Sequence, residues 1–130
     1  MKNQELKDRT KQFALRIIRM ADSLPHKTAA DVLGRQVLRS ATSVAANYRS
    51  ACRARSRADF ISKMGIVEEE ADESGLWLEL ISESHLLPAE KLTELQREAG
   101  ELTAIAVTSI RTARSRSANP QSAIRTPQLS

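Results

Sequence analysis

The strongest constraint on the fold is a regular repeat in the middle of the chain. Between residues 60 and 81, candidate inward-facing residues recur at alternating steps of four and three: Phe60, Met64, Val67, Ala71, Ser74, Leu78 and Ile81. Because an α-helix has about 3.6 residues per turn, this spacing places all of them on one face over about three heptads. Such a stripe has to be covered by other helices, so it predicts the seam of a helical bundle.

Three further segments show the same helical spacing of apolar residues, at residues 6–23, 28–53 and 92–114. Aromatic residues make up only 3% of the chain, and Gly and Pro contribute four residues each, which favours helices over a sandwich or barrel. Short connections favour antiparallel neighbours. We predict an all-α fold, an antiparallel, up-down-up-down, left-handed four-helix bundle that occupies residues 1–115 as a single domain.

The ends of the helices carry recognisable signals. Thr28 or Asp31 is expected to cap the second helix and Ser56 the third, while Pro88 is expected in the first turn of the fourth. The last segment, residues 116–130, is rich in Ser, Pro, Gln and Asn and has little apolar surface to bury. We therefore predict a disordered C-terminal tail there.

Cysteine content and hydropathy indicate the compartment. Cys52 is the single cysteine, so an intrachain disulfide is excluded, and its place on the apolar stripe of the second helix predicts a small buried thiol. No apolar run approaches the roughly 18 residues of a membrane span, and the first residues are too polar for a signal peptide. These observations predict a cytoplasmic protein without a membrane partner.

Charge is divided unevenly along the chain. Residues 1–63 hold 14 Lys and Arg against 5 Asp and Glu, a net +9, whereas residues 64–130 hold 6 against 11, a net −5. On the second helix, four arginines fall within about 80° of one another, opposite the apolar stripe. With two arginines of the following connection they form the predicted nucleic-acid-binding surface: Arg35, Arg39, Arg49, Arg53, Arg55 and Arg57.

The third helix carries a second row of residues about 100–160° away from its seam. Apolar side chains and carboxylates alternate there, and the row includes the only tryptophan of the chain: Ile66, Glu70, Glu73, Trp77 and Leu80. Aromatic anchors among paired charges are typical of subunit interfaces, so we predict that this row joins subunits of a homo-oligomer. The alternative is a wide core face with Trp77 at the edge of the bundle.

The sequence nominates no catalytic machinery. It contains no Gly-rich phosphate loop, no G-x-S-x-G motif and no H-E-x-x-H motif. The acidic run at 68–73 has no Glu-x-x-His partner of the kind a di-iron bundle needs, and His26 and His85 lack a ligand-spaced neighbour. We therefore predict a protein that is not an enzyme and has no metal or cofactor.

A family resemblance rests on the second and third helices. A pattern of Arg, Ala, Ser, Val, Ala and Asn is followed by a Phe-Ile pair, at Arg39, Ala41, Ser43, Val44, Ala46, Asn47, Phe60 and Ile61. This pattern resembles the bacterial 23S rRNA intervening-sequence proteins over about residues 6–115. Residues 48–51 read Tyr-Arg-Ser-Ala where the common form has Ile-Ala-Glu-Gly, which indicates an arginine-rich branch.

The resemblance implies an antiparallel four-helix bundle that assembles as a ring-like homopentamer and has no enzymatic activity. The family is also similar to the accessory variability proteins of diversity-generating retroelements. Those are basic pentameric bundles that associate with nucleic acid and a reverse transcriptase, an analogy that favours polyanion binding.

Two functional hypotheses follow. In the first, the arginine surface binds RNA or DNA by charge and shape, repeated by symmetry in the oligomer. In the second, the protein is a protein-interaction scaffold whose arginines pair with acidic residues of neighbouring subunits, such as Glu69, Glu70 and Glu73. The sequence alone does not choose between phosphates and carboxylates as the partners of these arginines.

Overall fold

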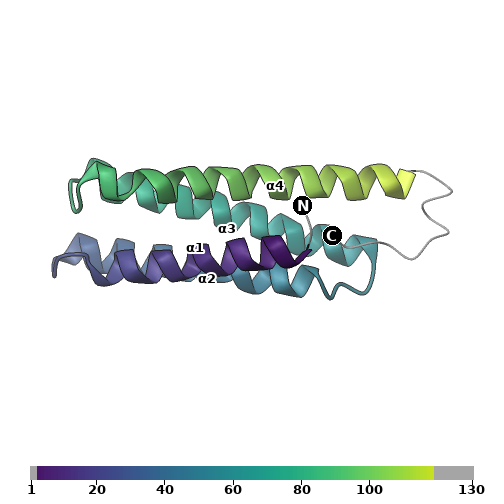
Figure 1. Ribbon diagram of the computed structural model, residues 1–130, viewed down its shortest axis with the longest axis horizontal. Coiled ribbons are helices and arrows are strands. Elements are labelled where there is room, and N and C mark those ends of the chain that lie inside the picture. Colours follow the sequence, from purple (N-terminus) through teal and green to yellow (C-terminus); the bar gives the residue numbers. More distant parts are fainter. Residues whose placement is uncertain (1–2, 119–130) are drawn as a thin grey trace.

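The computed structural model describes residues 3–118 and confirms the predicted all-α fold (Figure 1). Within these residues there are four long helices, one short 3-10 turn and no strand. The elements are α1 (Asn3–Asp22), α2 (Thr28–Ala51), α3 (Arg57–Glu83), the 3-10 turn η1 (Ala89–Lys91) and α4 (Thr93–Ala118).

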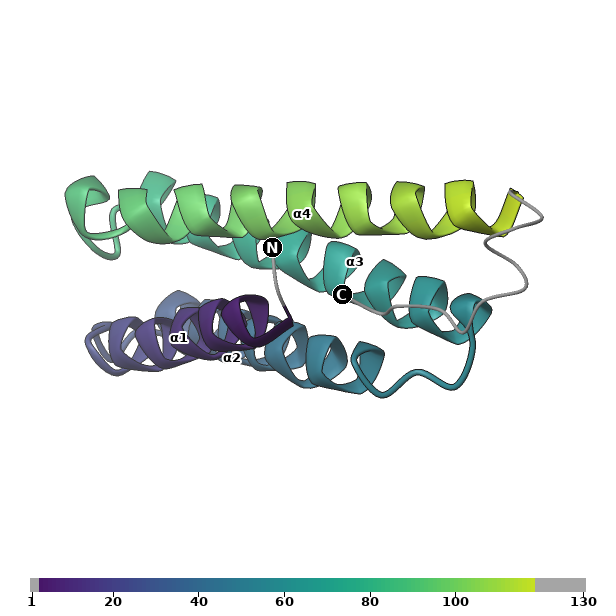
Figure 2. The same cartoon turned by 45° about the vertical axis from the view of Figure 1, so that its right-hand side comes forward.

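The four helices lie along the long axis of the molecule, and short connections at alternate ends make successive helices antiparallel (Figure 1). Each helix packs against the next one in the sequence, and α1 and α4 close the bundle with the least contact (Figure 2). Arg9 of α1 bridges these two helices: its Nε donates to Oε2 of Glu98 at 3.0 Å, and its Nη2 lies 3.3 Å from Oε1 of Glu101. The hydrogen bond to Glu98 raises the pKa of Arg9.

The predicted stripes form the core. The seven residues that repeat between positions 60 and 81 are all buried, as are the six apolar residues expected on α4 between Leu92 and Ile110. The buried face of α2 carries small residues such as Ala41 and leaves room for large side chains of its neighbours, and Phe13 of α1 and Met64 of α3 are 1% and 0% exposed. The helical spacing of the sequence therefore identifies the core-facing side of each helix.

One polar contact lies inside this core, between α2 and α3. The hydroxyl groups of Ser40 and Ser74 are 2.7 Å apart and both residues are 0% exposed. The Ser74 hydroxyl also lies 2.8 Å from the carbonyl oxygen of Glu70, to which it donates. Both polar groups are thus satisfied by protein partners, and the pair links α2 directly to α3 inside the core.

Several helix ends differ from the sequence expectation. The cap of α2 is Lys27, without a side-chain hydrogen bond, because Thr28 is already the first helical residue. Helix α2 ends at Ala51, so Cys52 stands at its C-cap and is half-buried instead of buried. Pro88 has an extended ψ of 139° and precedes η1 instead of joining α4.

The end of α4 also differs, because the helix continues to Ala118. Its last turn therefore includes residues 116–118, which the sequence assigned to the tail. The rest of the predicted disordered tail, residues 119–130, lies outside the described residues.

We predict that neighbouring isoleucines of α1 contribute very differently to stability. Ile17 is 0% exposed, whereas Ile18, about 100° further round the helix, is 38% exposed. Ile17→Ala should lower the free energy of unfolding by about 2–5 kcal/mol, because it leaves a cavity in the core. Ile18→Ala, the matched control, should cost less than about 1 kcal/mol. Urea denaturation measures both, and equal losses would contradict the assignment of the two faces.

Candidate nucleic-acid interface

The four arginines predicted on one ridge of α2 all point away from the core. Arg35, Arg39, Arg49 and Arg53 are exposed, as the helical spacing predicts, although α2 ends at Ala51 and Arg53 lies just beyond it. The structure places the four arginines in three different environments. They are therefore not equivalent.

Arg39 is already engaged within its own chain. Its Nη1 donates to Oε2 of Glu70 and its Nη2 to Oε1 of Glu73, both at 2.9 Å. The charge of Glu70 and the hydrogen bond to Glu73 raise the pKa of Arg39. Glu70 and Glu73 are two of the carboxylates that the second hypothesis assigned to contacts with a neighbouring subunit. Here they form ion pairs with an arginine of the same chain, and both Nη1 and Nη2 of Arg39 are occupied.

Arg35 lies near the other end of α2. It lines a separate hollow of about 240 Å³ beside the α1–α2 connection, together with the carboxyl-bearing residues Asp22 and Asp31. At about 1.5 Å per residue, Arg35 is about 20 Å along the helix axis from Arg49. This distance and the nearby carboxylates separate Arg35 from the main basic region.

Arg49, Arg53 and Arg55 meet at one hollow of about 650 Å³. The hollow, here called the basic hollow, lies where the C-terminal end of α2, the α2–α3 connection and the first turns of α3 come together. Its full lining is Ala46, Arg49, Ser50, Arg53, Arg55, Asp59 and Lys63. Four cationic side chains thus share a concave surface with a single carboxylate, which makes the hollow suited to an anion.

Local hydrogen bonds hold the connection that forms one wall of the basic hollow. The Ser56 hydroxyl accepts a hydrogen bond from the backbone N–H of Asp59 at 3.0 Å, which confirms Ser56 as the cap of α3. The Asp59 carboxylate in turn accepts from the backbone N–H of Arg55 at 3.3 Å. Asp59 is therefore occupied with the backbone of the connection, and the two contacts fix the position from which Arg55 extends.

Lys63 is a member of the basic hollow that sequence reasoning missed. It projects from α3 and its Nζ donates to the Ser50 hydroxyl at 2.9 Å, which draws it toward the C-terminal end of α2. The sequence gives no direct signal for this contact, since Lys63 lies outside the arginine run of α2 and its neighbourhood depends on the packing of α3. Arg57, by contrast, was predicted in the surface, but it is half-buried and is not among the residues that line the hollow.

The residues predicted at a subunit interface all lie on α3, and two of them, Glu70 and Glu73, are paired with Arg39 of α2. Ile66 and Leu80 are 38% and 40% exposed, and Leu76 between them is 45% exposed. Trp77 is half-buried and packs against the core, and its indole Nε1 is buried without a hydrogen-bond partner. Trp77 therefore lies at the edge of the core, next to an exposed apolar surface.

The described part of the chain contains neither a cluster of metal-ligating side chains nor a membrane-spanning helix. Among residues 3–118, no group of three or more His, Cys, Asp or Glu side chains is arranged to hold a metal ion. None of the helices there is long and apolar enough to cross a membrane.

Comparison with known proteins identifies the family. The model of the 23S rRNA-intervening sequence proteins matches residues 2–108. The chain belongs to this family. A solved structure from the S23 ribosomal protein family of Bacteroides thetaiotaomicron, described as a protein of unknown function, is 35% identical, with a TM-score of 0.78. The match covers 85% of this chain and 99% of that chain. No match was found among curated proteins.

The segment that carries the resemblance to the 23S rRNA-intervening sequence proteins forms the middle of α2. Ala41 and Val44 in it are 0% exposed and face the core. The Asn47 side-chain amide donates to the carbonyl and hydroxyl oxygens of Ser43 at 3.0 and 2.9 Å. Together with the Arg39 ion pairs, these contacts give this part of the family pattern a role in helix packing.

We predict that the Ser56 cap stabilises α3 and with it the wall of the basic hollow. Ser56→Ala should lower the free energy of unfolding by about 1 kcal/mol, because the N–H of Asp59 loses its acceptor. Ser62→Ala, at an exposed position inside α3, is the matched control and should be neutral or slightly stabilising. Thermal unfolding of both variants measures the difference, and equal effects would contradict the capping role.

Proposed function

We propose that this member of the 23S rRNA-intervening sequence protein family is a non-enzymatic, cytoplasmic, homo-oligomeric bundle that binds RNA or DNA through its basic hollow. The observation that carries the proposal is the convergence of Arg49, Arg53, Arg55 and Lys63 on one concave surface with a single carboxylate. One carboxylate, Asp59, cannot neutralise four cations, and it is also held by the backbone N–H of Arg55.

The chemistry of the hollow suits a phosphate backbone. An arginine guanidinium can donate two parallel hydrogen bonds to phosphate, and three exposed arginines here belong to two adjoining segments. Ala46 lines the same hollow and presents only a methyl group, which leaves room for a bulky backbone to approach the helix. Since affinity grows with the number of phosphates neutralised together, repetition of the hollow in an oligomer would strengthen binding.

The exposed apolar surface of α3 supports an oligomer. Ile66, Leu76 and Leu80 are each at least 38% exposed, and Val32 of α2 is 51% exposed. Apolar residues gathered on one side of a small protein are typical of an interaction surface. We propose that this surface joins subunits, in a pentamer as the family resemblance implies. The alternative function, a protein-interaction scaffold held by arginine pairs between subunits, is weakened by the engagement of Arg39 within its own chain.

We predict that RNA binding depends on the basic hollow and on salt. The triple variant Arg49→Ala, Arg53→Ala and Arg55→Ala should bind a single-stranded RNA at least tenfold more weakly. The slope of log affinity against log salt should fall by about 2, because three phosphate contacts are removed. Fluorescence anisotropy at several salt concentrations measures both quantities.

The matched control for this experiment removes the same charge elsewhere. Arg19, Arg35 and Arg111 are exposed and lie outside the basic hollow, so their replacement by alanine should leave most of the affinity intact. An equal loss in the control would show that net charge, and not the hollow, attracts RNA. A wild-type protein that ignores both RNA and DNA would overturn the proposal.

We predict that the α3 surface holds the oligomer together. The wild-type protein should have the solution mass of a pentamer by light scattering, and Ile66→Glu with Leu80→Glu should reduce that mass, because charges would replace buried apolar contacts. Ile18→Glu, at an equally exposed position of α1, is the control and should leave the mass unchanged. A monomeric wild-type protein would contradict the prediction.

A further inference from the structure

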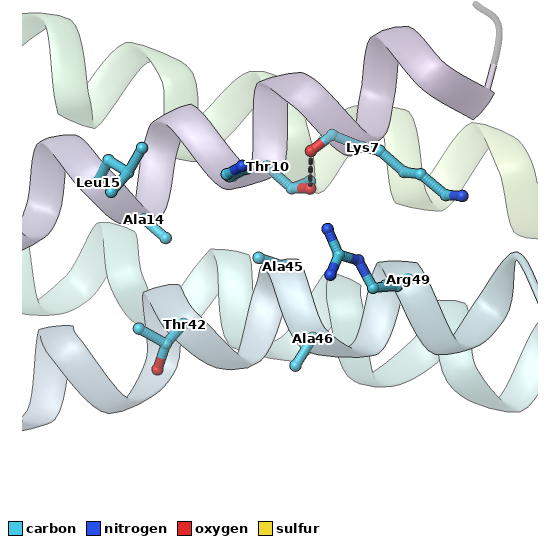
Figure 3. A pocket seen from close by; sticks show the side chains of 9 residues that line it. Lys7, Thr10, Ala14, Leu15, Thr42, Ala45, Ala46 and Arg49 are labelled. Atoms are coloured by element: carbon cyan, nitrogen blue, oxygen red, sulfur yellow. Dashed lines mark hydrogen bonds between the residues drawn. The ribbon is translucent and has the colours of Figure 1, made fainter.

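A second hollow lies in the groove between α1 and α2, and its floor is made of small side chains. Its volume is about 500 Å³, within the usual range for sites that hold a small organic group. Ala14 of α1 and Ala45 of α2 lie between the two helices there, whereas Ala46, which also lines the hollow, points away from α1 (Figure 3). The groove is therefore shallow-walled and apolar at its base, which suits a flat apolar surface.

The groove is cationic toward one end. Lys7 of α1 and Arg49 of α2 lie at this end (Figure 3), and Lys11, one turn further along α1, also lines the groove. Ala14, Leu15 and the uncharged Thr42 border the other end. In Figure 3 the Arg49 side chain extends from α2 toward α1 near Thr10 and Lys7. A ligand that fits both ends needs an anionic group joined to an apolar body.

The groove and the basic hollow adjoin. Ala46 and Arg49 line both of them, so the Arg49 guanidinium stands at the junction. An anion held at the cationic end of the groove would therefore be followed, toward the α2–α3 connection, by further positions for anions at Arg53, Arg55 and Lys63. A linear polymer with repeated anionic groups and flat side groups matches this succession, and single-stranded nucleic acid has that composition.

We propose that the α1–α2 groove is a base-binding subsite that holds one unpaired nucleobase of a single strand whose phosphates continue into the basic hollow. The inference rests on the function proposed above and makes it more specific. In a duplex the bases are paired and stacked inside, and only phosphates would reach the protein. In a single strand one base can turn into the groove, lie on the alanine methyl groups and stack against the planar Arg49 guanidinium.

The subsite discriminates little between bases. The Thr10 hydroxyl donates to the carbonyl oxygen of Lys7 at 3.0 Å, and the Thr42 hydroxyl donates to that of Leu38 at 2.7 Å. Their protons are thus used within their own helices, which leaves only acceptor positions for a base edge. Recognition here depends on shape and stacking, and not on a hydrogen-bond code.

The test fills the groove without a change of charge. Ala45→Met places a longer side chain at a half-buried position of the floor, and Thr42→Met does the same at an exposed position where the fold has room for it. Each variant should bind single-stranded RNA about tenfold more weakly, the effect of one lost base contact, with duplex affinity unchanged. Ala104→Met, on the exposed side of α4, is the matched control and should bind both forms like the wild type.

The outcomes separate this inference from the function on which it rests. Loss of single-strand binding in both methionine variants, with duplex binding intact, supports the subsite. If both variants bind the single strand like the wild type, the subsite is overturned while the basic hollow stands. If single strand and duplex bind equally and weaken together only in the arginine triple variant, the protein reads phosphates alone. Absence of binding to either form overturns both proposals.

Discussion

The close approach of α2 and α3 is the constraint on which the rest of the structure depends. Inside their contact the hydroxyl groups of Ser40 and Ser74 lie 2.7 Å apart, and the small residues Ala41 and Ala71 are also 0% exposed. Side chains of this size let two helices pack closely. If the helices slid apart, the buried hydrogen bond would break and its polar groups would be left unsatisfied, which costs free energy. The pair therefore fixes how the residues of one helix stand relative to those of the other.

This relative position decides which charges meet. One residue before Ser40, Arg39 faces the two α3 carboxylates Glu70 and Glu73 and is neutralised by them. Toward the far end of the same helix pair, the arginines of α2 meet Lys63 instead of a carboxylate. The acidic run of α3, residues 68–73, lies near the middle of that helix. The positive charge that exceeds the nearby carboxylates therefore lies where α2 ends and α3 begins.

The resulting basic surface is built on rigid elements. Its arginines lie on the last turn of α2 or on the connection that the Ser56 cap holds in place. The adjoining groove lies between α1 and α2. Such a surface presents its charges from fixed positions, which is what the proposed binding of a polyanion requires. A paired guanidinium such as that of Arg39 contributes to the fold, whereas Arg49 stands at the junction of two hollows.

The sequence by itself determined the helices, the buried face of each and the outward direction of the arginines, because a period of 3.6 residues is a local property. It also indicated Ser56 as a cap from its place before a helix. It did not show that Arg39 is paired, or that Lys7, Lys11 and Lys63 join the basic region. Those contacts join residues of different helices, and their partners depend on the distance and relative shift of packed helices, which only the tertiary structure decides.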